Sequence, residues 1–84
     1  MPISNYQATE LTRMALDAAG LKNVCILAMG CLTRVIYIGH HCQSWHAETQ
    51  TLCEAMEGVQ DETDFLKRMN ASHFIPASGG VGSF

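Results

Sequence analysis

Two apolar segments on either side of a short turn decide the fold of this chain: Val24-Cys25-Ile26-Leu27-Ala28-Met29, then Gly30-Cys31, then Leu32-Thr33-Arg34-Val35-Ile36-Tyr37-Ile38. A glycine at the first position of a two-residue loop is typical of the type II′ turn of a β-hairpin. A hairpin that is exposed on one side alternates apolar and polar residues. Here the first segment is apolar throughout, and only Thr33 and Arg34 interrupt the second. We therefore expect both faces of the hairpin to be covered, one of them by a partner.

The two-residue turn also fixes the register of the hairpin. The expected pairs are Met29 with Leu32, Leu27 with Arg34, and Cys25 with Ile36. No cysteine then lies opposite another cysteine. With no secretory signal at the N-terminus, this favours four free thiols in a reducing compartment and a cytoplasmic location.

Helical signals surround the hairpin. Ser4-Asn5-Tyr6-Gln7 has the form of a capping box, and Gly20 is suited to end the helix that follows. A second helix is expected from its cap at Ser44 through Glu57, with Trp45 on its apolar stripe. A third is expected from its cap at Asp61 through residue 68 or 69.

The C-terminal part carries weaker signals. Residues 72–77 could form a short strand, which Pro76 restricts to the edge of a sheet. Residues 78–84 have the Gly- and Ser-rich composition of a flexible tail. The prediction is a small single α+β domain at 1–77, in the order αββαα with a central antiparallel hairpin and this edge strand, followed by the tail.

Composition limits the classes of function. With 84 residues the chain has room for one small domain, and 48% hydrophobic residues indicate a globular one. A net charge of −3 and scattered basic residues disfavour direct binding of nucleic acid. No apolar run approaches the length of about 18 residues that suggests a membrane span.

A cluster of potential metal ligands lies between the hairpin and the expected second helix. His40, Cys42 and His46 could point to one zinc ion if the chain is extended before a helix. The spacing matches no common zinc motif, and the fourth ligand would have to come from elsewhere, with His73 or Asp61 as candidates. We therefore expect no metal and no other cofactor, and keep zinc binding as the alternative.

A cysteine-dependent enzyme is a further alternative. Cys42 lies just before the expected helix N-terminus, which can lower the pKa of a thiol, and His41 or His46 could act as a base. No oxyanion hole or orienting third group can be identified in the sequence. This alternative is therefore ranked last, and no catalytic residue is assigned.

The leading hypothesis is a non-enzymatic protein-binding module that forms a homodimer and acts by occupying the surface of a partner. The expected dimer interface is Val35, Ile36, Tyr37 and Ile38. Six of the eight acids, with no Lys or Arg among them, form a predicted docking surface for a basic protein partner: Glu48, Glu54, Glu57, Asp61, Glu62 and Asp64. The small size and acidic charge would suit an inhibitor of a nucleic-acid-binding machine, of the kind that phages encode.

Overall fold

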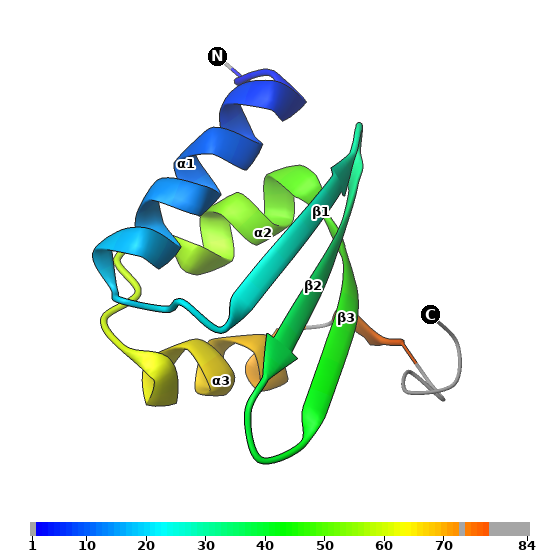
Figure 1. Ribbon diagram of the computed structural model, residues 1–84. Helices are drawn as coiled ribbons and strands as arrows, with labels where there is room; N and C mark the ends of the chain where they lie inside the picture. Colours follow the sequence, from blue (N-terminus) through cyan, green and yellow to red (C-terminus); the bar gives the residue numbers. More distant parts are fainter. Residues whose placement is uncertain (1, 73, 78–84) are drawn as a thin grey trace.

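The computed structural model describes residues 2–72 and 74–77, and its elements form a small α+β domain (Figure 1). The elements follow one another as α1 (Asn5–Ala18), β1 (Val24–Met29), β2 (Leu32–Ile38), β3 (Cys42–Glu48), α2 (Thr49–Met56), α3 (Glu62–Ala71) and β4 (Ile75–Pro76). The predicted fold class is confirmed, and the order differs by one additional strand, β3. Among the described residues, no helix has both the length and the apolar character needed to cross a membrane.

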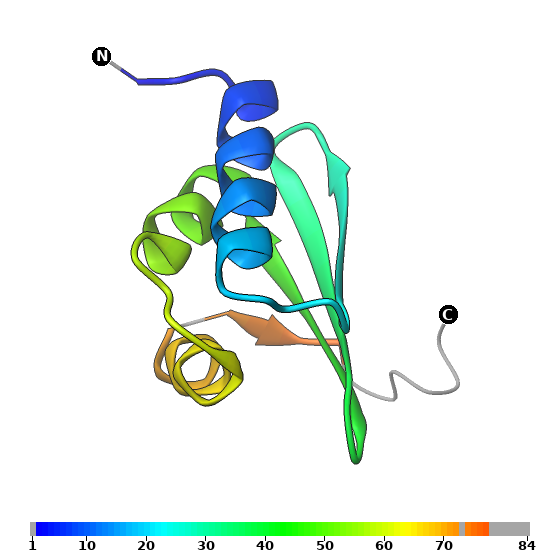
Figure 2. The same cartoon turned by 60° about the vertical axis from the view of Figure 1, so that its left-hand side comes forward.

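The four strands form one antiparallel sheet in the order β1-β2-β3-β4. The hairpin has the predicted register, with Met29 opposite Leu32 at the turn. Gly30 has φ 65°, as the first position of a type II′ turn requires. All three helices cover the same face of the sheet, which we call the inner face (Figure 2).

The predicted second helix is wrong in its first half. Residues 42–48 form strand β3, which pairs with β2, and α2 begins only at Thr49. Ser44 therefore caps no helix, and its hydroxyl has no hydrogen-bond partner among the described residues. The period is that of a strand, because Trp45 and Ala47 point to the inner face while His46 between them is exposed.

The core lies between the inner face and the helices. Its centre is Phe65 of α3, which is fully buried. The Phe65 ring lies 6.1 Å from the ring of Trp45 in an edge-to-face arrangement and 6.0 Å from that of Tyr37. Contacts of this kind contribute beyond simple burial of apolar area. Trp45 is thus a core residue, as predicted, although it belongs to a strand.

The helix ends follow the capping signals of the sequence. Ser4 and Gln7 form the reciprocal capping box of α1, and Gly20 follows that helix with φ 74°. Asp61 caps α3 by accepting a hydrogen bond from the backbone N–H of Asp64. β4 lies at the edge of the sheet, as Pro76 required. The predicted tail at 78–84 lies outside the described residues.

Arg68 joins α3 to the end of α2. Its guanidinium donates to the carboxylate of Asp64 at 3.0 Å and to the backbone carbonyls of Ala55, Glu57 and Gly58. These carbonyls lie at the C-terminal end of α2, where helices leave acceptors without intrahelical partners. The Arg68 hydrogen bond is the main cause that lowers the pKa of Asp64, followed by the backbone N–H of Gln60.

This lowered pKa predicts a pH-dependent stability. Because the pKa of Asp64 is lower in the folded protein than in the unfolded chain, its stabilising contribution is complete well above pH of about 4 and is lost as the pH falls through the lowered pKa. The melting temperature of Asp64→Asn should lie below that of the wild type at pH 7, and this difference should shrink at pH 3. An equal difference at both pH values would contradict this assignment.

Candidate functional site

The face of the sheet opposite the helices, the outer face, is apolar and open. Five large side chains on this face are between 48% and 74% exposed: Leu27, Met29, Leu32, Ile38 and Ile75. They belong to the three strands β1, β2 and β4. The register places Met29 opposite Leu32, and Ile75 opposite His46 at the other side of the sheet. Ile36 and the exposed Cys25 lie opposite each other between these residues.

Strand geometry explains why these residues share one face. Successive side chains of a strand point to opposite faces, so Leu32, Ile36 and Ile38 of β2 point outward. Their neighbours Val35 and Tyr37 point inward, where both are buried under the helices. Since β2 carries apolar residues in both sets, covering the inner face leaves a second apolar surface without cover from the described residues.

The predicted interface is therefore divided between the two faces. Ile36 and Ile38 lie on the outer face, and Ile38 is 62% exposed. Val35 and Tyr37 belong to the core, with 0% and 6% exposure. The outer face also contains Leu27, Met29, Leu32 and Ile75, which were not predicted as interface residues. The period-two pattern of the hairpin was the signal for the first three.

Polar groups occupy the middle and one end of the outer face. Arg34 of β2 lies opposite Leu27 on one side and His46 of β3 on the other. Glu48 lies opposite Leu32, where its carboxylate also accepts a hydrogen bond from Thr51. The outer face thus combines a large apolar area with charges of both signs, which is a composition suited to binding protein.

The potential zinc ligands are not brought together. Cys42 and His46 lie on the same strand, four residues apart, which corresponds to about 13 Å. Ligands of one zinc ion lie within about 2.3 Å of the metal. Among the described residues no three His, Cys, Asp or Glu side chains are grouped to hold a metal ion. His40 precedes the strand in the connecting loop, and His73, the other candidate, lies outside the described residues.

The thiols lie apart from one another. Cys25, Cys31 and Cys42 are exposed, Cys53 is partly buried, and none of the four is in a disulfide in the described structure. The expected position of Cys42 just before a helix N-terminus is wrong, because Cys42 is the first residue of β3. Cys42 therefore lacks the position before a helix on which its predicted role as a nucleophile depended.

The six clustered acids divide into different roles. Asp61 and Asp64 are engaged in the capping and the Arg68 contacts of α3. Glu62 accepts hydrogen bonds from the Tyr37 hydroxyl at 2.9 Å and from Asn23 at 3.3 Å, and the former is the main cause that raises the pKa of Tyr37.

The other three acids lie elsewhere. Glu48 is the last residue of β3, and its carboxylate accepts a hydrogen bond from Thr51 in the first turn of α2. Glu54 and Glu57 are exposed on and just after α2. A docking surface for a basic partner stays a prediction, and Glu54 and Glu57 are its members whose carboxylates take no part in the contacts described above.

Comparison with known proteins finds no family model that matches the chain, and no match among curated proteins or solved structures. The function of the protein must therefore be inferred from its own surface. Five of the eight large apolar side chains that are exposed among the described residues lie on the outer face, which is the basis of the proposal that follows.

Proposed function

We propose that this protein is a protein-binding module that assembles as a homodimer by packing the outer faces of two copies against each other. The observation that carries the proposal is the set of five large apolar side chains, 48% to 74% exposed, on one face of a sheet whose other face packs against the helices. The largest exposed apolar patch of a protein is often an interaction site.

The area of this face fits a small dimer interface. Complete burial of a Leu, Ile or Met side chain removes roughly 60–120 Å² of apolar surface, as follows from its transfer free energy. At the observed exposures the five side chains offer on the order of 300 Å² per copy, or about 600 Å² for two. A biological interface needs about 1,000 Å² in total, of which roughly 56–65% is apolar. The two amounts agree.

A second copy also fits the shape and charge of the face. Two twisted sheets pack face to face with their strands about 30° apart, which a two-fold axis can produce. The outer face carries Arg34 on β2 and Glu48 on β3, so a two-fold arrangement can place unlike charges opposite each other. The apolar residues would then form the dry centre of the interface.

The test is the oligomeric state in solution. Wild-type protein at tens of micromolar should have the mass of a dimer by light scattering. The double variant Leu32→Lys/Ile38→Lys should have the mass of a monomer and should stay folded, because both positions are exposed and surface substitutions usually change stability by no more than about 0.5 kcal/mol.

Leu11→Lys provides the matched control. Leu11 is 47% exposed on α1, on the helical side of the molecule, so the same kind of substitution there should leave the dimer intact. A monomeric wild type, or a double variant that remains a dimer, would overturn the proposal.

A further inference from the structure

Strand β1 is the first strand of the sheet, and within residues 2–72 and 74–77 it pairs only with β2, which leaves its other edge free along its whole length. Backbone groups of successive residues in an antiparallel strand point alternately to one neighbour and to the other. The bond from the N–H of Ile38 to the carbonyl of Asn23 shows that the odd-numbered residues of this segment face β2. The N–H and C=O groups of Val24, Ile26 and Ala28 therefore point outward.

Nothing in the sequence of β1 blocks this edge. Proteins usually protect edge strands with proline, charged residues, a bulge or a very short strand. β1 has six residues and contains no proline and no charge. The strand at the opposite edge of the sheet, β4, has two of these protective features, because it is only two residues long and one of them is Pro76. Among the described residues, no backbone group bonds to the outward-pointing groups of β1.

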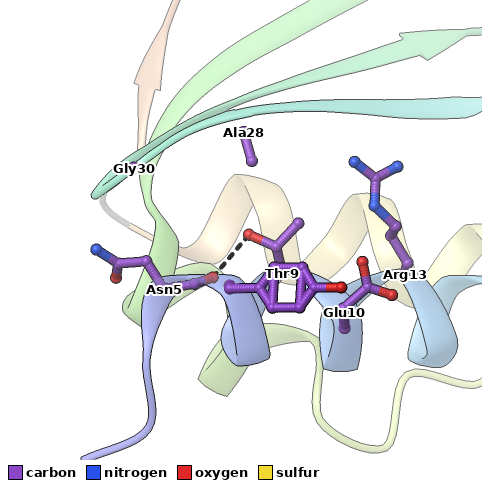
Figure 3. A pocket seen from close by; sticks show the side chains of 7 residues that line it. Asn5, Thr9, Glu10, Arg13, Ala28 and Gly30 are labelled. Atoms are coloured by element: carbon purple, nitrogen blue, oxygen red, sulfur yellow. Dashed lines mark hydrogen bonds between the residues drawn. The ribbon is translucent and has the colours of Figure 1, made fainter.

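Two hollows that share Arg13 lie between β1 and α1 beside this free edge, and we refer to them together as the groove. One is a hollow of about 340 Å³, where Tyr6, Glu10 and Arg13 of α1 lie across from Ala28. The other is a hollow of about 240 Å³ at the opposite end of β1, between Arg13 and Val24. Figure 3 looks into the first hollow and shows Thr9 and Arg13 rising from α1 toward the strand.

We propose that this groove binds an extended segment of a partner protein, which adds to the sheet as a strand beside β1. Main-chain hydrogen bonds to Val24, Ile26 and Ala28 would supply affinity, as in other cases in which a peptide extends an open sheet. The proposal concerns the edge of the sheet and goes beyond the proposed dimer, which uses the outer face.

The surroundings of the groove define the chemistry of this segment. Every second side chain of an added strand would face α1, where Glu10 and Arg13 are exposed and unlike in charge. The side chains between them would continue the outer face beside Leu27 and Met29. The groove therefore suits a segment of about six residues in which apolar residues alternate with polar or charged ones.

The position of α1 argues against a second copy as the occupant. Both cartoon views show α1 running alongside β1 on the inner side of the sheet (Figures 1 and 2). Pairing β1 with the β1 of another copy across a two-fold axis would bring a second α1 to the same side of the joined sheet, where the two helices would have to fit at a packing distance of about 8–10 Å. A single strand brings no such helix with it.

The experiment uses synthetic probes, because the partner is not identified. The probes are fluorescein-labelled seven-residue peptides in which valine alternates with threonine, lysine or glutamate, and binding to the full chain is measured by anisotropy. At least one peptide should bind. Hydrogen exchange should then slow at the amides of Val24, Ile26 and Ala28, while those of Cys25 and Leu27 are protected by β2 already in the free protein.

Ala28→Pro is the decisive variant. Ala28 is exposed and its N–H points away from β2, so proline removes an outward donor without breaking the hairpin. Peptide affinity should fall about tenfold or more, since a lost main-chain bond and an obstructing ring each weaken the pairing. Ala28→Thr keeps the donor and should bind normally, and a peptide with N-methyl groups on the amides that face β1 should not bind.

Three results would overturn the proposal. They are the absence of binding by every peptide in the set, binding without protection of the three outward amides, and equal binding by Ala28→Pro and Ala28→Thr. Light scattering of Ala28→Pro keeps this test separate from that of the dimer, because the outer-face residues Leu32 and Ile38 are unchanged in this variant. If the protein is a dimer but binds no peptide, only the proposed peptide binding in the groove is contradicted, and the proposed dimer is not.

Discussion

Replacing Trp45 with alanine is expected to remove a large part of the stability of the protein. Trp45 is 4% exposed and packs edge to face on Phe65 at the centre of the core. Truncation of a buried Trp to Ala typically costs 3–5 kcal/mol. A domain of 84 residues has a total stability of about 4–13 kcal/mol. The loss therefore approaches the lower end of that stability.

Urea denaturation followed by circular dichroism measures this effect. The variant should show a large fall in the transition midpoint or no folded baseline at all. Tyr6→Ala is the control, because Tyr6 is also aromatic but 73% exposed, and its midpoint should stay close to that of the wild type. A Trp45→Ala protein with wild-type stability would mean that Trp45 anchors a partner and not the core.

The second large effect is expected from a carboxylate introduced on β2. Whether it prevents folding or weakens the dimer should depend on which face of the sheet the side chain occupies. Val35 is fully buried, so Val35→Asp puts a carboxylate without a partner into the core and should abolish folding. Ile38 lies on the same strand but is 62% exposed, so Ile38→Asp should stay folded and should instead weaken the dimer. Both substitutions replace an apolar β-branched side chain with aspartate. They differ in that Val35 points to the inner face and Ile38 to the outer face.

Circular dichroism and light scattering on the same samples distinguish the two outcomes. Val35→Asp should lose its secondary structure signal at 25 °C. Ile38→Asp should keep the wild-type spectrum while its mass shifts toward the monomer, and salt should not restore the dimer, because the lost contact is apolar. If Val35→Asp folds normally and Ile38→Asp does not, the inner and outer faces have been assigned in reverse.

Much of the fold could be predicted from local signals. The capping box at Ser4 and the glycine at position 20 defined α1, and Asp61 marked the start of α3. Gly30 set the register of the hairpin, because a two-residue turn admits one pairing. These features depend on residues within a few positions of each other, so they are readable from the sequence.

The residues 42–48 show where local signals fail. Ser44 has the chemistry of a helix cap, and Trp45 fits a helical stripe with Leu52 and Met56. The strand forms because β2 offers a hydrogen-bonding partner along its whole length, and because Trp45 in β3 can reach Phe65. Both contacts span long separations in the sequence, so tertiary structure overrides the local preference here.

The sequence by itself determined that the hairpin has two apolar faces. Only the tertiary structure decided which of the two faces lies toward the helices. All three helices pack on the side of Val35 and Tyr37, so Leu32, Ile36 and Ile38 lie on the side that no helix covers. The groove at β1 likewise depends on where α1 comes to lie. The hydrophobic effect is non-directional, so the apolar composition of a strand predicts that its faces are buried but not which element buries each of them. That is decided by tertiary packing.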